Sequence, residues 1–539
     1  MSYCSPSRWA DAAPACASRS RAWASIRTKC WAGFPNASSH DVKRRAHIKT
    51  SAIVNSGDKT MQPTFSAVAE PLASPDVRVA TTPGAHISAR MDRLPVTRHL
   101  WMLVLLISLG GFFEIYDLIF TGYIAPGMAK SGLLQTTTHA FFGFTGIAGF
   151  IAATFAGLFI GTFFFGWLPD RYGRRSVFTV SLLWYSIGSA IMAFQTTPEG
   201  VIFWRFVTGI GVGVEIITID SYVTELVPQH MRGRAMAFNQ MVMFAAAPVA
   251  AILSYWLVPE TVFGLDGWRI VVLAGSVGAV IVWFIRRAVP ESPRWLAMHG
   301  RHDESERVVS EIERVVERQS GAALPPPAAV VEQPAHRRAS LSELLRAPYR
   351  SRLIMLIVFN FCQAIGYYGF ANWVPTLLIG QGITVTKSLL YSFIIAFALP
   401  VGPMLAMFYA DRIQRKWLIV GGALVVIASG IAFGQMKSPA ALIALGVLIS
   451  LAGQTISVCY HAYQTELFPT AVRCRASGIV YSASRAGAMM SGFIIAFLLK
   501  DFGVPGVFTG ITVFMLIVAL AIGLFGPRTN GLRLEELNH

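Results

Sequence analysis

The stretch FFGWLPDRYGRRSVF, residues 164–178, places the carboxylate of Asp170 and the guanidinium groups of Arg171, Arg174 and Arg175 directly between two apolar runs. Charged side chains are costly inside a lipid bilayer, so a cluster of this kind is expected in a loop just outside it. The stretch therefore predicts two membrane-spanning helices joined by a short charged loop.

This charged loop has a copy later in the chain. The segment MFYADRIQRKW, which contains Asp411, Arg412 and Arg415, lies 241 residues after the first loop. A second pair of segments, ELVPQHMRGR from Glu225 and ELFPTAVRCR from Glu466, is separated by the same 241 residues. Two unrelated motifs that share one spacing indicate a duplicated unit, an architecture found in secondary transporters.

The composition is that of a protein that crosses the membrane many times. Hydrophobic residues make up 54% of the 539 residues and charged residues only 14%, and a helix needs about 20 apolar residues to cross a bilayer. None of the apolar runs alternates with period two, which argues against barrel strands. We predict an all-α membrane protein with 12 transmembrane helices in two six-helix repeats, at 99–122, 144–167, 176–195, 201–223, 234–257 and 268–287, and at 352–378, 388–410, 417–435, 440–463, 476–499 and 505–526.

Polar segments set the remaining boundaries. Residues 1–98 are rich in Ala, Ser, Arg and Pro without helical periodicity, so we expect a disordered extension. Met61 and Met91 are alternative translation starts, and a start at Met61 would leave residues 1–60 outside the natural protein. The segment DESERVVSEIERVVERQ predicts a charged surface helix, to which we assign no chemistry. The resulting division is an N-terminal half at 99–287, a linker at 288–351, a C-terminal half at 352–526 and a tail at 527–539.

Several classes of protein are excluded by what the sequence lacks. It has no GxxxxGK[ST] motif for a phosphate and neither HExxH nor GxSxG for an enzyme. Its six cysteines form no CxxC pair, so no metal site and no disulfide framework are predicted. The formal charge of +16 lies largely in the N-terminal extension and in loops, which does not indicate a nucleic-acid-binding face. We expect no enzyme, no cofactor and no nucleic-acid partner.

The distribution of basic residues predicts the orientation in the membrane. Basic residues are concentrated in alternating loops, and the poorer set of loops carries only Lys130, Arg269, Lys387, Lys437 and Lys500. Because loops rich in Lys and Arg stay in the cytoplasm, both termini are expected there. We predict a monomeric, multi-pass protein of the plasma membrane, which in bacteria is the inner membrane.

With these motifs in place, the chain resembles the major facilitator superfamily. That superfamily carries G-x-x-x-D-R-x-G-R-R between its second and third helices, and a degenerate copy in its second half. Its sugar-porter and metabolite:proton symporter branches are suggested by PESPRWLAMHGR from Pro290, RFVTGIGVGVE from Arg205 and GPRTNGLRLEEL from Gly526. The tail departs from the sugar-porter pattern at Arg528 and Asn530, which weakens sugar as the predicted substrate.

The resemblance implies that the paired charged loops form a gate on the cytoplasmic side. A carboxylate at a helix end can accept charge-assisted hydrogen bonds and so latch one state of a carrier. The alternative is that the arginines only orient the protein. The predicted gate residues are Gly166, Asp170, Arg171, Gly173, Arg174, Arg175, Glu225, Arg232, Asp411, Arg412, Arg415, Glu466 and Arg473.

Charged residues inside the membrane runs are candidates for proton coupling. Glu114 and Asp117 are three residues apart in GGFFEIYDLIFTG and share a helix face, so each carboxylate is expected to raise the proton affinity of the other. Arg205 resembles the buried arginine that the family uses in proton coupling, and Glu215 and Asp220 follow it on the same helix. The alternative is a structural carboxylate pair satisfied by its neighbours.

Polar residues in two later runs predict the substrate cavity. Gln363, Tyr367, Tyr368 and Asn372 can hydrogen-bond and stack. Arg485 is expected either to pair with an anionic substrate or to neutralise a membrane carboxylate.

We therefore predict a secondary active transporter that moves a small polar metabolite, an organic acid, by proton symport with alternating access. Its partners are that small molecule, protons and the lipid bilayer. Two alternatives remain open: a sugar or polyol carrier working by symport or uniport, and a non-transporting membrane sensor built on a carrier fold.

Overall fold

The computed structural model describes residues 83–135, 145–285, 289–327, 344–346, 349–409, 412–468 and 470–529. These residues belong to one unit of the chain, Pro75–His539. The first half contains α3 (Arg98–Lys130), α4 (Gly146–Phe165), α5 (Leu168–Tyr172), α6 (Arg174–Ala193), α7 (Pro198–Leu226), η1 (Gln229–Met231), α8 (Arg232–Phe244), α9 (Ala246–Leu257) and α10 (Gly267–Ile285). The second half contains α14 (Tyr349–Ala371), α15 (Val374–Gly380), α16 (Val385–Ala396), α17 (Ala398–Tyr409), α18 (Arg415–Gln435), α19 (Pro439–Glu466) and α20 (Thr470–Phe525).

These helices confirm the predicted all-helical membrane fold. Ten segments of the described chain are long and apolar enough to cross a membrane. One of them, within α20, is two helices in sequence, because Gly503 with φ 64° breaks the helical geometry there. With the shorter apolar helix α10, they account for the twelve predicted spans. The strands β1 (Thr261–Val262) and β2 (Leu265–Asp266), each two residues long, pair antiparallel as a short hairpin between α9 and α10.

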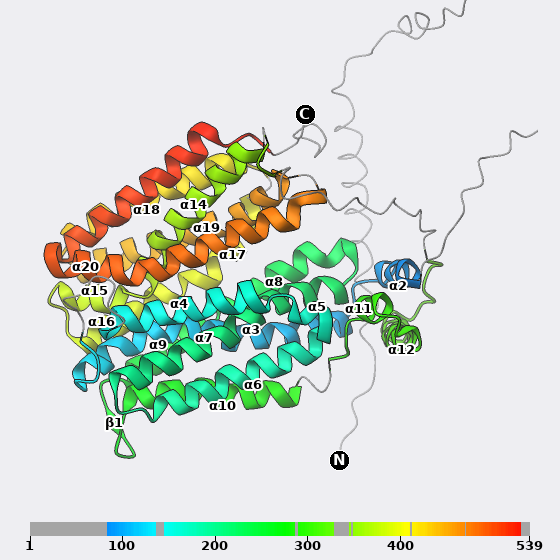
Figure 1. The fold of residues 1–539 in the computed structure, drawn as a ribbon, viewed down its shortest axis with the longest axis horizontal. Coiled ribbons are helices and arrows are strands. Elements are labelled where there is room, and N and C mark those ends of the chain that lie inside the picture. The colour runs from blue at the N-terminus through cyan, green and yellow to red at the C-terminus, as the bar shows by residue number, and fades with distance from the viewer. Residues whose placement is uncertain are drawn as a thin grey trace, which may run out of the picture. The chain divides into compact units, whose positions relative to one another are not determined.

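The two halves pack against each other along several pairs of helices. The helices of the second half, yellow to red in Figure 1, lie beside those of the first half, blue to green. The contacts join α4 to α20, α9 to α16, α8 to α17 and α3 to α15. A Cβ atom at Gly122 of α3 would lie 2.3 Å from the main-chain oxygen of Asn372, so this close approach requires glycine.

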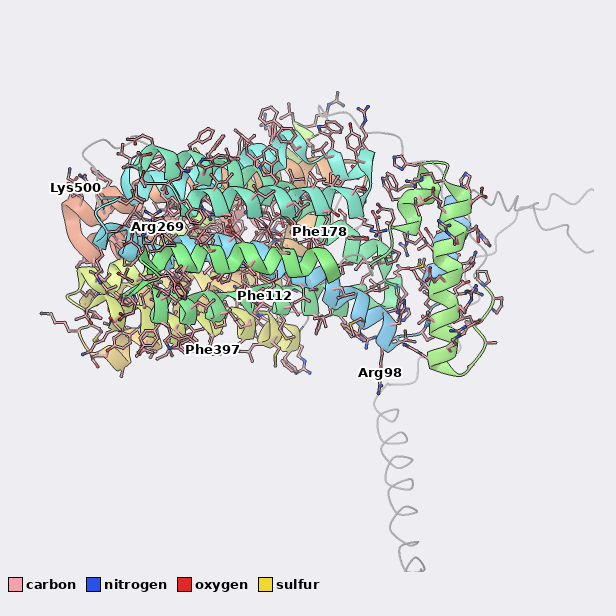
Figure 2. The ribbon with its side chains drawn as sticks, turned by 90° about the horizontal axis from the view of Figure 1, so that it is seen from below. Arg98, Phe112, Phe178, Arg269, Phe397 and Lys500 are labelled. Carbon is pink, nitrogen blue, oxygen red and sulfur yellow. The ribbon has the colours of Figure 1, made fainter. Side chains whose placement is uncertain are left out.

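We call the end of the bundle at α5 and at the first residues of α8 and α18, Arg232 and Arg415, the basic end. The opposite end carries Arg269 and Lys500. Figure 1 shows α2 (Pro83–Asp92), α11 (Pro293–Met298) and α12 (His302–Ser320) gathered beside the basic end. In Figure 2 Arg98 lies toward these helices, whereas Arg269 and Lys500 lie at the opposite end. The charged surface helix predicted within the linker is confirmed as α12.

The helix α2 corrects the expectation that residues 1–98 are disordered throughout. Its Arg90 and the following Arg93 donate hydrogen bonds to Glu313 of α12, and Arg90 also pairs with Glu306. Burial raises the pKa of Glu313, but the hydrogen bonds from both arginines outweigh it, so its pKa is lowered from its ordinary value. Sequence periodicity missed α2 because its apolar stripe is only two residues long, Ile87 and Met91, which are buried one turn apart. Residues 1–82 lie outside the described chain.

Candidate functional site

A buried ion pair joins α3 to α7 in the first half. Arg205 is 0% exposed, and its Nη1 donates a hydrogen bond to Oδ2 of Asp117 at 2.7 Å. Its Nη2 donates to the main-chain oxygen of Asp117 at 2.6 Å and to Oγ1 of Thr121 at 2.5 Å. Its Nε donates to Oγ1 of Thr154 at 2.9 Å. The second carboxylate oxygen of Asp117 accepts a hydrogen bond from Ser189 at 2.8 Å. Four helices, α3, α4, α6 and α7, thus hold this pair.

Aromatic rings and a tight helix crossing surround the pair. The Cζ atom of Arg205 lies 4.9 Å from the ring centroid of Phe120 and 5.6 Å from that of Phe150. A Cβ atom at Gly209 would lie 2.5 Å from the main-chain oxygen of Thr154, so glycine allows α7 to approach α4 this closely. Breaking a buried ion pair costs about 3–5 kcal/mol, because one charge is left without a partner. Protonation of Asp117 would neutralise the carboxylate and weaken its hold on the guanidinium group.

Glu114 lies one turn before Asp117 on α3 but has different surroundings. It is 0% exposed, lines a cavity, and has no hydrogen-bond partner for either carboxylate oxygen among the residues that the structure describes. Its strongest electrostatic neighbours are Glu215, Asp220 and Arg485. Residues three apart are offset by about 60° around a helix. The structure therefore does not bring Glu114 and Asp117 together as one hydrogen-bonded pair.

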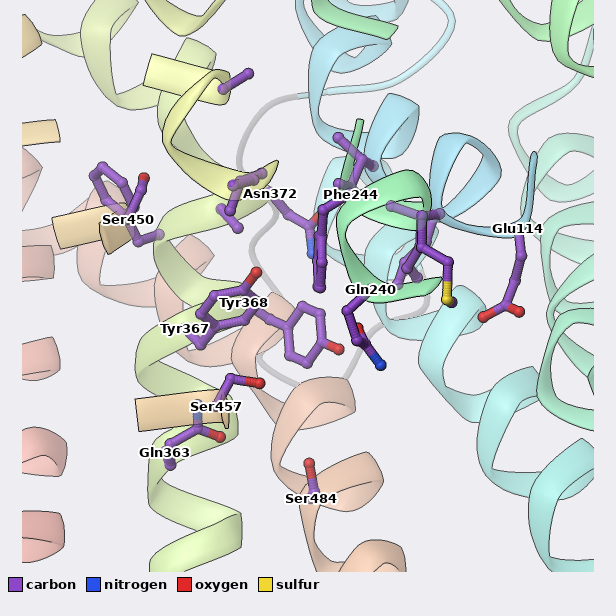
Figure 3. A pocket seen from close by; sticks show the side chains of 18 of the residues that line it. Glu114, Gln240, Phe244, Gln363, Tyr367, Tyr368, Asn372, Ser450, Ser457 and Ser484 are labelled. Atoms are coloured by element: carbon purple, nitrogen blue, oxygen red, sulfur yellow. The ribbon is translucent and has the colours of Figure 1, made fainter. Parts of the chain in front are cut away.

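A cavity of ≈ 160 Å³ lies between the two halves. Its walls come from α3, α7 and α8 of the first half and from α14, α15, α16, α17, α19 and α20 of the second half. In Figure 3 Gln363, Tyr367 and Tyr368 lie on one side of the cavity and Glu114 lies on the other. A cavity of about 150 Å³ can hold one benzene molecule, so this cavity suits a ligand of about one six-membered ring.

The residues predicted to form the substrate cavity all line it. They are Gln363, Tyr367, Tyr368, Asn372 and Arg485. Arg485 is 7% exposed, hydrogen-bonds to Tyr368, and has no hydrogen-bond partner for its Nε among the described residues. Of the predicted coupling residues, Glu114 and Asp220 also line the cavity. Glu215 is buried beside α3, where its Oε1 would lie 3.2 Å from a Cβ atom at Gly110.

Sequence reasoning missed a polar cluster on α19 and α20. His461 lines the cavity, stacks on Tyr460 with ring centroids 4.1 Å apart, and lies 5.5 Å from the ring of Tyr481. Its Nδ1 lies 2.6 Å from the main-chain oxygen of Ser457. Ser457, Tyr460, His461 and Gln464 recur at helical spacing within one apolar run, and this pattern was the available signal.

At the basic end, four of the predicted gate residues of the first half, Asp170, Arg174, Arg175 and Glu225, belong to one network. Arg174 pairs with Asp170 at 2.7 Å and with Glu225 at 2.9 Å. The main-chain N–H groups of Arg174 and Arg175 donate to Oε1 of Glu291 at 3.0 and 3.1 Å. Glu291, in the PESPRW segment, was not among the predicted gate residues.

The other gate residues have separate positions. Gly173 has φ 94°, which favours glycine, and follows α5, whereas Gly166 follows α4. Arg171 lies 5.6 Å from the rings of both Trp167 and Tyr172. Nε of Arg232 donates to the main-chain oxygen of Thr224.

In the second half Arg415 pairs with Glu466, which repeats the contact between Arg174 and Glu225. Arg412 is exposed. Asp411 and the side chain of Arg473 lie outside the described residues. The pairs Asp170–Arg174, Arg174–Glu225 and Arg415–Glu466 each join residues of the same half.

Comparisons with known proteins agree with this architecture. The chain is 29% identical to the niacin transporter NiaP of Acinetobacter baylyi, covering 83% of this chain and 99% of that protein. It is 28% identical to the inner membrane metabolite transport protein YdjE of Escherichia coli, covering 84% and 98%. The structure matches the inward-open xylose transporter XylE of E. coli with a TM-score of 0.63 and 20% sequence identity, covering 81% and 99%.

Twelve spans in two halves, with a shared polar cavity between them, define the class as a multi-pass membrane carrier rather than an enzyme. The family model described as "Sugar (and other) transporter" matches residues 103–539. The chain therefore belongs to this sugar transporter family of the major facilitator superfamily, and it is a metabolite transporter.

Proposed function

We propose that this protein carries a small organic acid across the bacterial inner membrane together with a proton. The observation that carries the proposal is the buried pair of Asp117 and Arg205, beside a cavity that contains a second buried cation, Arg485. The two halves would alternate in opening this cavity to either side of the membrane.

Asp117 is suited to carry the proton. When it is ionised it binds Arg205 and fixes α3 against α7; when it is protonated, the charge that holds the guanidinium group is lost. Each proton would therefore change the packing between two helices that flank the cavity. The proton step described here uses only the side chains of Asp117 and Arg205.

Arg485 is suited to bind the carboxylate of the substrate. A guanidinium group forms strong, directional hydrogen bonds with a carboxylate, and its free Nε leaves one donor for a ligand. One relative is named for niacin, a carboxylic acid with one ring, and a ligand of this size fits the cavity volume.

We further propose that the basic end and both termini face the cytoplasm. The excess of Lys and Arg at the basic end supports this orientation. The ion pairs Asp170–Arg174 and Arg415–Glu466 would then act as parts of the cytoplasmic gate.

The test is transport by the purified full chain in proteoliposomes, with radiolabelled nicotinate and benzoate as probes. An imposed inward proton gradient should drive accumulation of a carboxylate probe. Asp117→Asn should abolish this accumulation but keep exchange of internal for external probe, since exchange moves no net proton. Glu199→Gln, an exposed change at the start of α7, is the matched control and should transport normally.

Two results would contradict the proposal. If no carboxylate probe accumulates, the substrate is not an organic acid of this kind. If Asp117→Asn still concentrates the probe in response to pH, Asp117 is not the coupling residue, and coupling must involve Glu114, Glu215, Asp220 or Arg205.

A sugar or polyol is the second candidate, because amide side chains of Gln240, Gln363 and Asn372 also line the cavity. Such groups suit a ligand rich in hydroxyls. Labelled xylose in the same proteoliposomes decides between the two candidates.

A further inference from the structure

The proposed function uses only one of two charged regions of the cavity. Arg485 comes from α20 of the second half, whereas Glu114 and Asp220 come from α3 and α7 of the first half. The same cavity thus presents a cation on one wall and carboxylates on the other. The remaining charged or titratable groups that line it are His461 and five tyrosines.

Glu114 lacks the partner that a buried carboxylate needs. Both its oxygens are buried and accept no hydrogen bond within the described chain. An unsatisfied buried charged group is strongly unfavourable. Of its strongest electrostatic neighbours, Glu215 and Asp220 are themselves acidic, and the third, Arg485, is the cation assigned to the carboxylate of the substrate. A donor or cation that enters the cavity would satisfy this carboxylate.

Aromatic side chains make the cavity suitable for a cationic group. Tyr123, Phe244, Tyr367, Tyr368 and Phe370 line it, and in Figure 3 Phe244 lies between the Tyr368 side and the Glu114 side. The face of an aromatic ring attracts a cation, and aromatic cages bind quaternary ammonium groups. Aromatic rings beside an unpaired carboxylate thus favour a nitrogen cation over a neutral ring.

We propose that the substrate is a zwitterion of about one ring, whose carboxylate binds Arg485 and whose cationic nitrogen lies against Glu114 and Asp220. The carboxylate half of this inference rests on the proposed function, whereas the cationic half is independent of it. Each charge of the ligand would then face groups of complementary chemistry, the guanidinium group of Arg485 and the carboxyl groups of Glu114 and Asp220. Glu114 then has a binding role that is separate from the coupling role of Asp117.

Four probes that share one flat six-membered ring separate the two charges. N-methylnicotinate carries both a carboxylate and a cationic ring nitrogen. Benzoate carries only the carboxylate, N-methylnicotinamide carries only the cation, and benzamide carries neither. Binding of each probe to the full chain in nanodiscs is measured by competition against the tightest radiolabelled probe.

The wild-type chain should bind N-methylnicotinate at least about tenfold more tightly than benzoate or N-methylnicotinamide, with benzamide weakest. Glu114→Gln should remove the advantage of N-methylnicotinate over benzoate and leave benzoate binding unchanged. Arg485→Gln should weaken both carboxylates. The matched controls, Glu199→Gln and the exposed Arg318→Gln, should bind all four probes like the wild type.

Three results would overturn the inference. The first is a wild-type chain that binds benzoate as tightly as N-methylnicotinate, or that does not bind N-methylnicotinate; this result needs no variant to fold. The second is a Glu114→Gln chain that weakens both carboxylates equally. The third is N-methylnicotinamide binding as tightly as N-methylnicotinate. A chain that prefers benzoate but still accumulates it under a proton gradient refutes the zwitterion and keeps the proposed function.

Discussion

Replacing Arg205 by Gln tests whether the buried ion pair holds the first half together. The change removes a guanidinium group that donates four hydrogen bonds, two of them to Asp117, and leaves that carboxylate buried with Ser189 as a donor. Leaving one member of a buried pair unpaired costs about 3–5 kcal/mol. We therefore expect Arg205→Gln to lower the free energy of unfolding by about that amount.

The assay is unfolding of the purified chain in mixed micelles by titration with SDS, followed by tryptophan fluorescence. Adding Asp117→Asn to Arg205→Gln should restore part of the loss, because the second change removes the unpaired charge. Arg269→Gln is the matched control. This arginine donates to the main-chain oxygens of Ala193 and Gln195, so its loss should cost about 1–3 kcal/mol, the usual penalty for unsatisfied polar groups.

A double-mutant cycle gives the deciding number. Residues in direct contact couple by about 0.5–3 kcal/mol, whereas independent sites add. If the losses from Asp117→Asn and Arg205→Gln simply add in the double variant, the two side chains do not depend on each other. The structural basis of the coupling mechanism would then be wrong.

Three further predictions concern the basic end. Asp170→Asn should slow transport while stability changes by less than about 1 kcal/mol, since the side chain is 75% exposed and such ion pairs are weak; unchanged turnover would contradict a gating role. A chain that starts at Met61 should transport like the full chain. A chain that starts at Met91 lacks Arg90, and its α12 should become accessible to limited proteolysis. Equal protection of α12 in the two truncated chains would contradict the packing of α2 against α12. Because the pKa of Glu313 is lowered in the folded chain, its ion pairs should stabilise the docking of α2 above about pH 4.5, and this stabilisation should be lost as the pH falls through the lowered pKa. Glu313→Gln should remove this pH dependence of the protection of α12 from protease. If the variant keeps the wild-type pH profile, another group causes the pH dependence.

Much of the site could be predicted because charged and polar residues are rare within membrane runs. Arg205, Asp117 and Arg485 stand out against apolar neighbours, and each of them is buried in the structure. His461 escaped prediction because a single histidine beside tyrosines reads as an ordinary polar position on a long apolar helix. Its place in the cavity depends on α19 facing α14 and α20, which no local pattern encodes.

The division of roles between Glu114 and Asp117 could not be read from their spacing. Helical periodicity places both on nearly one face, and that face meets two different environments. Asp117 meets Arg205 because Gly209 lets α7 approach α4 closely. Glu114 lines the cavity because the second half packs against α3 at Gly122, next to Asn372, and the cavity lies between the halves there.

The sequence by itself determined the helical membrane fold, the duplication and the identity of the charged candidates, since a bilayer restricts backbone structure to helices and makes every intramembrane charge conspicuous. It could not determine which charges pair, because pairing depends on distances between helices that are far apart in the chain. Only the tertiary structure separated a closed ion pair at Asp117 and Arg205 from the unpaired carboxylate of Glu114, since packing decides which buried groups find partners within the protein and which are left to a ligand.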